Sequence, residues 1–262
     1  MRCRQTTVRT ARRFTLVALI TLLPLATASP ALAEGTWTKQ TFVPPSARYG
    51  HAMAYAGGDK VLLFGGYASG PNGDTWLYDL SANRWTDQAG APSARSMHAM
   101  ASLGGDQVHL FGGYDDDDYD GETWVYDLSA STWMEQAPTA GPSARMWHAM
   151  AYLGGDKVLL FGGSSGGDET WVYDLGDNGW TDQAPAAGPS ARWGHAMASL
   201  GGDQVLLFGG DVDGPNGETW LYDLGDNSWT DQAPAAGPTA RAGHAMASIG
   251  EGQVLLFGGV DD

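Results

Sequence analysis

The chain has 262 residues and a formal net charge of −16, with 30 acidic residues against 14 basic ones. A field of this sign argues against nucleic acid and anionic membrane surfaces as partners. The only cysteine is Cys3, so the rest of the sequence offers no disulfide, no thiolate nucleophile and no cysteine metal ligand.

The first 33 residues have the pattern of a secretory signal peptide. Five arginines precede or open an apolar stretch over residues 14–26, and residues 31–33 form the small-x-small site A-L-A. That stretch is shorter than the roughly 20 residues of a membrane-spanning helix, and Arg12-Arg13 also fits the twin-arginine export route. We therefore expect one mature domain over residues 34–262. It is expected to be secreted, to insert into no membrane, and to carry a net charge of −21 once the five leader arginines are removed.

Residues 45–262 repeat one line of sequence. Each copy places a histidine three residues after an arginine, and these arginines recur at intervals of 47, 50, 47 and 49 residues, as Arg48, Arg95, Arg145, Arg192 and Arg241. Self-similarity with a period in this range is the signature of a repeat architecture. A residue that is present in every copy is therefore first of all a candidate for building the fold.

Each copy contains four short extended segments between turn signals, which the first copy illustrates. Residues 47–55 form the first segment, and A-G-G-D after it predicts a hairpin turn, because glycine adopts positive φ without strain. Residues 61–64 (V-L-L-F) are apolar in succession, which predicts a strand buried on both faces, and Gly65-Gly66 ends it. Residues 75–80 (T-W-L-Y-D-L) form the third segment, and Trp85-Thr86 forms the fourth and outermost one.

Four-stranded antiparallel sheets that are buried on both faces need a similar sheet on either side. Radial repetition around an axis supplies such neighbours and leaves only short sheet edges exposed. The sequence therefore predicts an all-β propeller with one sheet, or blade, for each repeat.

The repeats also resemble the kelch motif, in which a Gly-Gly doublet after apolar residues is followed by a spaced tyrosine and tryptophan. Four copies carry it: Gly65-Gly66 with Tyr78 and Trp85, Gly112-Gly113 with Tyr126 and Trp133, Gly162-Gly163 with Tyr173 and Trp180, and Gly209-Gly210 with Tyr222 and Trp229. The resemblance covers the mature chain and implies a kelch-type propeller. It indicates activity only weakly, because kelch propellers include both binding scaffolds and enzymes. Galactose-oxidase-like members need a tyrosine cross-linked to a cysteine, which the mature chain lacks.

The fifth copy is incomplete, because it contains Phe257-Gly258-Gly259 but no third segment before Asp262. Residues 37–40 (W-T-K-Q) match the outermost segment of the first copy, W-T-D-Q. We expect a five-bladed propeller with an incomplete closing blade, in which the Trp37 segment pairs with residues 254–257. The alternative is a shortened form of a six- or seven-bladed propeller.

The five repeat arginines, at Arg48, Arg95, Arg145, Arg192 and Arg241, are the candidate ligand-binding residues. Equivalent positions in successive blades form a ring around the axis, and a ring of guanidinium groups suits a carboxylate, sulfate or phosphate. The alternative is a structural role, in which each arginine pairs with the aspartate of a Y-D-L segment, at Asp79, Asp127, Asp174 or Asp223. The histidines beside the arginines are predicted to pack between blades, and His109 is predicted to be a tolerated replacement of a leucine.

The loops after Gly-Gly differ most between copies, and variable loops on a constant scaffold are where specificity usually lies. Two of them are acidic, with Asp115, Asp116, Asp117, Asp118 and Asp120 in the second copy and Asp211 and Asp213 in the fourth. Carboxylate oxygens suit calcium, so these residues are candidate calcium ligands, although they lack the twelve-residue spacing of a calcium loop. The alternative is a solvated acidic loop that holds no cofactor.

The sequence contains no Walker motif of nucleotide-binding loops and no H-E-x-x-H motif of zinc proteases. We expect an exported, monomeric, non-catalytic scaffold that binds a protein or carbohydrate partner through its variable loops. The alternative is an enzyme or small-anion-binding domain that uses the axial arginines.

Overall fold

The computed structural model describes residues 45–88, 90 and 92–261, so the predicted closing segment around Trp37 lies outside the described residues. The chain divides into two units, Met1–Lys39 and Gln40–Asp262, and the following description concerns the second.

Strands are the only regular elements of the described residues, and each repeat folds into one antiparallel meander. The first sheet consists of β1 (Ala52–Gly57), β2 (Lys60–Phe64), β3 (Thr75–Asp79) and β4 (Arg84–Gln88). The second consists of β5 (Ala99–Gly104), β6 (Gln107–Phe111), β7 (Thr123–Asp127) and β8 (Thr132–Gln136). The third sheet consists of β9 (Ala149–Gly154), β10 (Lys157–Phe161), β11 (Thr170–Asp174) and β12 (Gly179–Asp182). The fourth consists of β13 (Ala196–Gly201), β14 (Gln204–Phe208), β15 (Thr219–Asp223) and β16 (Ser228–Asp231). The fifth repeat contributes a two-stranded sheet of β17 (Ala242–Gly250) and β18 (Gln253–Val260). The predicted all-β architecture of four full sheets and one incomplete sheet is confirmed.

The first strand of each full sheet begins later than its sequence pattern predicts. Residues 47–55 were expected to be extended throughout, but β1 begins only at Ala52. Gly50 has a φ of 62°, in the left-handed region, and this conformation interrupts the extended backbone before the strand. The predicted turn after β1 is confirmed, since Gly57, Gly58 and Asp59 all have positive φ.

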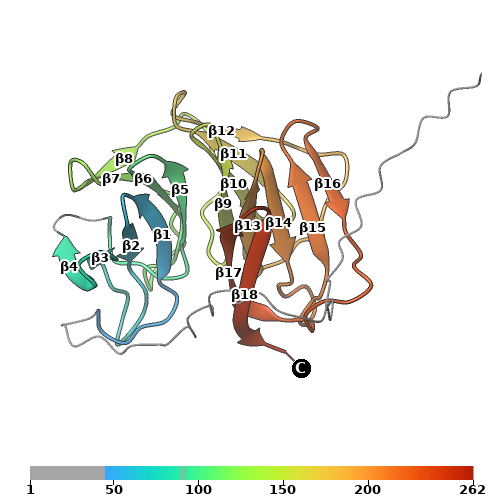
Figure 1. The fold of residues 1–262 in the computed structure, drawn as a ribbon, viewed down its shortest axis with the longest axis horizontal. Coiled ribbons are helices and arrows are strands. Elements are labelled where there is room, and N and C mark those ends of the chain that lie inside the picture. The colour runs from blue at the N-terminus through green and yellow to red at the C-terminus, as the bar shows by residue number, and fades with distance from the viewer. Residues whose placement is uncertain (1–44, 89, 91, 262) are drawn as a thin grey trace, which may run out of the picture. The chain divides into compact units, whose positions relative to one another are not determined.

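The five sheets are arranged radially. Their first strands, β1, β5, β9, β13 and β17, pack against one another in chain order (Figure 1). Equivalent residues of all five strands, among them Met53, Met100 and Met246, line one shared cavity of about 200 Å³. The first strands therefore surround a common axis, and the later strands of each sheet lie farther from it.

The three interfaces among the four full sheets use the same two faces. The forward face of a sheet, which in the first sheet carries Leu62, Phe64 and Leu77, packs on the back face of the next. That back face carries Met100, Val108, Leu110, Tyr126 and Trp133 in the second sheet. The same pairing recurs between the second and third sheets and between the third and fourth. The core of the domain is thus a series of equivalent layers between sheets, which explains why apolar residues follow one another in β2 and its counterparts.

In each of these layers, a tryptophan on the fourth strand of one sheet forms a hydrogen bond with a threonine of the preceding sheet. The indole N–H of Trp133 donates to the Thr75 hydroxyl of the preceding sheet at 3.0 Å, and Trp180 and Trp229 donate equally to Thr123 and Thr170. Beside the fourth sheet, the place that such a tryptophan would occupy is a cavity of about 600 Å³ in the described part of the chain, lined in part by Thr219 and Gly237.

The first and last sheets each leave one face uncovered by described residues. Met53, on the back face of the first sheet, is 47% exposed, whereas its counterpart Met100 is 7% exposed. Phe257, on the forward face of the fifth sheet, is 82% exposed, although Phe64, Phe111, Phe161 and Phe208 are buried. The two faces are of the complementary types that meet between all the inner sheets.

Candidate binding face at the loop end of the axis

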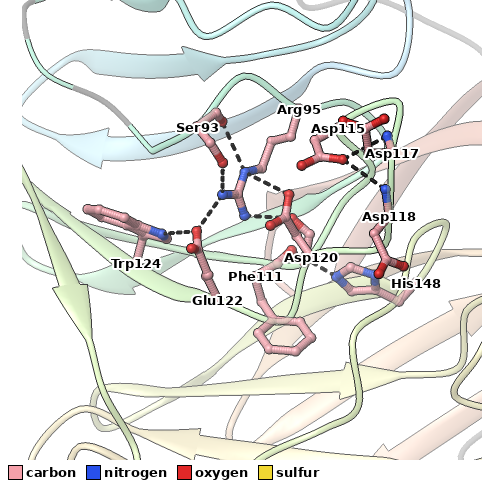
Figure 2. A network of polar contacts seen from close by, with 11 residues as sticks. Ser93, Arg95, Phe111, Asp115, Asp117, Asp118, Asp120, Glu122, Trp124 and His148 are labelled. Carbon is pink, nitrogen blue, oxygen red and sulfur yellow. Dashed lines mark hydrogen bonds and ion pairs between the residues drawn. The ribbon is translucent and has the colours of Figure 1, made fainter.

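The repeat arginines use their donors on neighbouring atoms, and three of them, Arg95, Arg145 and Arg192, are buried. Arg95 is fully buried and donates from Nε to the Ser93 carbonyl oxygen (3.1 Å) and from Nη1 to the Gly112 carbonyl oxygen (3.2 Å). Its Nη2 donates to Glu122 Oε2 at 2.5 Å, and Trp124 donates its indole N–H to the same oxygen (Figure 2). The other copies pair Arg145 with Glu169, Arg192 with Glu218 and Arg48 with Asp74. Within residues 45–88, 90 and 92–261, no carboxylate pairs with Arg241.

These contacts correct the predicted partners of the arginines. Asp79 and Asp174 pair instead with Lys60 and Lys157, and Asp223 accepts a hydrogen bond from Gln204. The acid that meets each of the first four arginines comes from the end of the variable loop, two residues before the tryptophan of the third strand. Anion binding by the five arginines stays a prediction, and the structure shows that an anion would have to compete with carbonyl and carboxylate acceptors already in place.

The second repeat places an additional acid beside its arginine. Asp120 Oδ2 lies 3.4 Å from Arg95 Nε (Figure 2). Burial, together with the nearby Glu122, Asp115 and Asp118, raises the pKa of Asp120 to about 6, despite the opposing effect of Arg95. This loop therefore carries a carboxyl group that changes charge near pH 6.

The Gly-Gly doublet and the Arg-x-x-His unit form one interlocking module. The Gly65 carbonyl oxygen accepts a hydrogen bond from Arg48 Nη1 of its own repeat, and Gly66 donates its N–H to the Arg95 carbonyl oxygen of the next repeat (2.9 Å). A Cβ on Gly65 would lie 2.6 Å from that Arg95 oxygen and 2.7 Å from His98 Cε1. The repeated glycines and arginines therefore hold successive sheets in register.

The histidines of this module pack between sheets, as the sequence predicts. His98, His148, His195 and His244 meet the phenylalanine of the preceding sheet edge-on, at centroid distances of 5.4–5.6 Å. Burial, reinforced by the neighbouring arginine, lowers the pKa of His98 and His195 to about 3. These imidazoles are consequently uncharged at neutral pH.

His109 lies where the other full repeats have Leu62, Leu159 and Leu206. Its ring is fully buried and stacked on Tyr173 at 4.3 Å, and neither ring nitrogen has a hydrogen-bond partner among the described residues. We expect His109→Leu to raise the free energy of unfolding by about 1–2 kcal/mol at neutral pH, because it removes buried unpaired nitrogens.

The gain from His109→Leu should grow as the pH falls. Burial lowers the pKa of His109 to about 3, below its usual 6.5, so the unfolded chain takes up a proton first and wild-type stability declines from pH 6.5 toward pH 3. Urea unfolding at neutral and mildly acidic pH measures both effects. Leu159→His is the matched control and should show the opposite changes; a loss of stability in His109→Leu at both pH values would contradict the prediction.

A series of four backbone hydrogen bonds joins successive repeats around the axis, two residues after each arginine. Its members, here called the axial ring, all have φ between 58° and 66°: Gly50, Met97, Trp147, Gly194 and Gly243. Met97 donates its N–H to Gly50, Trp147 to Met97, Gly194 to Trp147 and Gly243 to Gly194, at 2.7–3.0 Å. These five residues and the module histidines line a cavity of about 360 Å³. Sequence reasoning missed this ring, although aligning the repeats shows that Met97 and Trp147 replace a glycine.

The variable loops lie at the same end of the sheets as the axial ring, and we call this end the loop face. Tyr49 bridges to Tyr67, Ser96 to Tyr114 and Trp193 to Asp211, so the residue that precedes three of the five ring members pairs with the start of a loop. Three aromatic pairs mark the loop face, Tyr49 with Tyr67 at 5.4 Å, Tyr114 with Tyr119 at 6.0 Å and Trp147 with Trp193 at 6.1 Å. Tyr49 and Trp193 are 56% and 41% exposed.

The acidic residues of the loop face cap their own turns. Asp115 Oδ1 accepts the backbone N–H groups of Asp117 and Asp118 (Figure 2), and Asp211 Oδ1 accepts that of Gly214. These hydrogen bonds lower the pKa of Asp115. In the described part of the chain, no group of three or more His, Cys, Asp or Glu side chains converges to hold a metal ion. Calcium binding by the Asp115–Asp120 and Asp211–Asp213 loops stays a prediction.

Residues 162–167 (G-G-S-S-G-G) match the G-x-S-x-G spacing found at serine nucleophiles. A nucleophile of that type lies on a turn between a strand and a helix. Here the residues form the loop between β10 and β11, and the Ser164 hydroxyl donates to the Met146 carbonyl oxygen at 3.3 Å. The local structure thus differs from that of a serine hydrolase.

Comparison with known families supports the assignment made from the repeats. The family described as the KLHDC2/KLHL20/DRC7 Kelch-repeats domain matches residues 30–210, more than half of the chain. No curated protein matches the sequence. The described residues include no helix that is long and apolar enough to cross a bilayer. The matched repeats, with the radial sheets and Gly-Gly modules, show that the chain belongs to the kelch-repeat family.

Proposed function

We propose that this kelch propeller is an exported, non-catalytic interaction scaffold that binds a polypeptide partner at its loop face. Export is inferred from the leader pattern over residues 1–33. The observation that carries the binding proposal is the contrast between a repeated interior and a loop face with exposed aromatic pairs that differ from copy to copy. Aromatic side chains supply contact area at low entropic cost and are enriched at interfaces.

The charge of the loop face favours a partner with basic residues. The repeat arginines are neutralised or satisfied within the domain, whereas Asp116, Asp117 and Asp213 are exposed. Lysine and arginine side chains can meet both these carboxylates and the aromatic faces. A carbohydrate is the second candidate, since the Trp147–Trp193 pair offers a flat apolar surface for a sugar ring.

Selection from a random peptide library, alongside an immobilised glycan array, tests the proposal. We expect enrichment of basic peptides with apolar residues, with binding that weakens as salt increases. The variant Asp116→Asn/Asp117→Asn/Asp118→Asn should weaken it, and Tyr78→Phe, outside the loop face, is the matched control. Enrichment of acidic peptides that depends on Arg241 would instead support the anion-binding alternative. The intact mass of the secreted protein tests the export proposal, which predicts a mature chain that begins near Glu34.

A further inference from the structure

Two bulky residues occupy a backbone conformation that favours glycine. Met97 has a φ of 58° and Trp147 a φ of 60°, and the three other members of the axial ring are glycines. Left-handed backbone is a genuine outlier for bulky side chains and costs of order 1–3 kcal/mol at each position. Most other non-glycine residues with positive φ are aspartate or asparagine in turns, for which the conformation is common.

The hydrogen bonds of the axial ring impose this conformation regardless of the side chain. Met97 donates its N–H to Gly50 at 2.7 Å and accepts one from Trp147 at 3.0 Å, and Trp147 in turn accepts the Gly194 N–H at 2.9 Å. Gly194 likewise donates to one neighbour and accepts from the other, while Gly50 and Gly243, at the two ends of the series, each make one such bond, so the same geometry recurs in every repeat. Glycine would satisfy that geometry without strain.

The two side chains are partly exposed beside the axial cavity. Met97 and Trp147 line the 360 Å³ cavity together with the module histidines. Met97 leans over the first repeat, where its Cγ would lie 3.3 Å from a Cβ on Gly50, and Trp147 leans toward Trp193 of the fourth repeat. With neutral imidazoles as the remaining side chains, the lining carries no formal charge near pH 7.

Acidic loops adjoin this uncharged cavity. Ser96, which precedes Met97, bridges to Tyr114, and the run Asp115–Asp118 follows directly. Trp193, which contacts Trp147, bridges to Asp211. An apolar group at the centre with cationic groups around it would match both features, because a charge placed in the cavity itself would lose its hydration without a counter-charge.

We propose that Met97 and Trp147 are specificity-determining residues that bind an apolar side chain of a basic polypeptide, with Asp116, Asp117 and Asp118 contacting its flanking lysines or arginines. This proposal rests on the function proposed above and specifies the class of partner. A purely structural role for Met97 and Trp147 makes a different prediction for stability, so the two roles can be separated.

Thermal unfolding of paired alanine and glycine variants separates those roles. Alanine and glycine truncate the side chain almost equally, but only glycine relieves the left-handed strain. We expect Met97→Gly and Trp147→Gly to melt no lower than the wild type, and about 2–4 °C above Met97→Ala and Trp147→Ala. Gly243→Ala is the control, since its φ is +66° and no atom lies within 4 Å of the added Cβ; it should melt lower than the wild type. Glycine variants that melt well below the wild type would show that the side chains are structural and would overturn the proposal.

Fluorescence polarisation with the labelled peptides KKLKK and KKSKK measures the binding step. The wild type should bind KKLKK roughly tenfold more tightly than KKSKK, as expected for burial of one leucine side chain. The double variant Met97→Gly/Trp147→Gly should lose this difference but keep the weak, salt-dependent binding of both peptides. The triple asparagine variant at Asp116, Asp117 and Asp118 should weaken both peptides alike.

Each remaining outcome overturns a distinct part of the proposal. Equal wild-type affinity for the two peptides would refute the apolar site and leave a basic partner in place. Failure of the wild type to bind either peptide would refute the basic partner itself. A leucine preference that persists in the double variant would assign the apolar site to other residues.

Discussion

Arg145→Ala is expected to lower the free energy of unfolding by at least about 3 kcal/mol. The guanidinium of Arg145 is fully buried and donates to the Ser143 carbonyl (2.9 Å), the Gly162 carbonyl (3.0 Å) and Glu169 Oε2 (2.5 Å). Its removal leaves those carbonyl oxygens without a donor and opens a cavity between sheets. Urea unfolding followed by tryptophan fluorescence measures the loss.

Arg241→Ala is the matched control. Arg241 makes the same hydrogen bonds to backbone, to Thr239 and Gly258, but its environment is exposed and no described carboxylate pairs with it. We expect a loss of about 1 kcal/mol or less. Equal losses in the two variants would show that burial of the arginine adds nothing, and would restore a ligand-binding role as the main reason for the repeated arginines.

Gly162→Ala is expected to cost about 3 kcal/mol of unfolding free energy. The added Cβ would lie 2.6 Å from the Arg192 carbonyl oxygen and 2.9 Å from His195 Cε1, and the φ of +67° strains any L-residue. The clash falls on the backbone of the next sheet, so it cannot be relieved by rotating a side chain. Thermal and urea unfolding both report this change.

Gly258→Ala separates the clash from the backbone strain. Gly258 is the equivalent glycine of the fifth repeat, with a φ of +78°, but no described atom lies within 4 Å of its added Cβ. It should therefore lose only the conformational cost of about 1 kcal/mol. If Gly162→Ala and Gly258→Ala lose the same amount, the Gly-Gly doublet serves the turn alone and does not lock neighbouring sheets.

The sheets could be predicted because the same local sequence signals for strands and turns recur in each repeat. Apolar residues in succession at residues 61–64 indicate burial on both faces, and Gly65-Gly66 marks a turn where a neighbour approaches closely. These are local signals, and five nearly identical copies reinforce them. The strand starts were less accurate, because nothing in residues 47–51 indicates that Gly50 interrupts the extended backbone.

The candidate site was harder to predict because its geometry depends on contacts between repeats. The acid that pairs with Arg95 is Glu122, at the end of a loop whose length varies, rather than an aspartate at a constant spacing. The backbone strain at Met97 and Trp147 arises from hydrogen bonds to other repeats. The residue types methionine and tryptophan do not by themselves indicate such bonds. Comparing equivalent positions of the repeats, where glycine is the usual residue, is the signal that reveals them.

The stacking of the sheets has a direction, because the forward face of each sheet packs on the back face of the next. Leu62 and Phe64 of one sheet always meet the counterparts of Val108 and Tyr126 in the next. One whole repeat inserted between two others would thus find a compatible surface on both of its sides, while a repeat inserted in reverse order would find none. Duplication of a repeat therefore needs no new kind of contact between sheets.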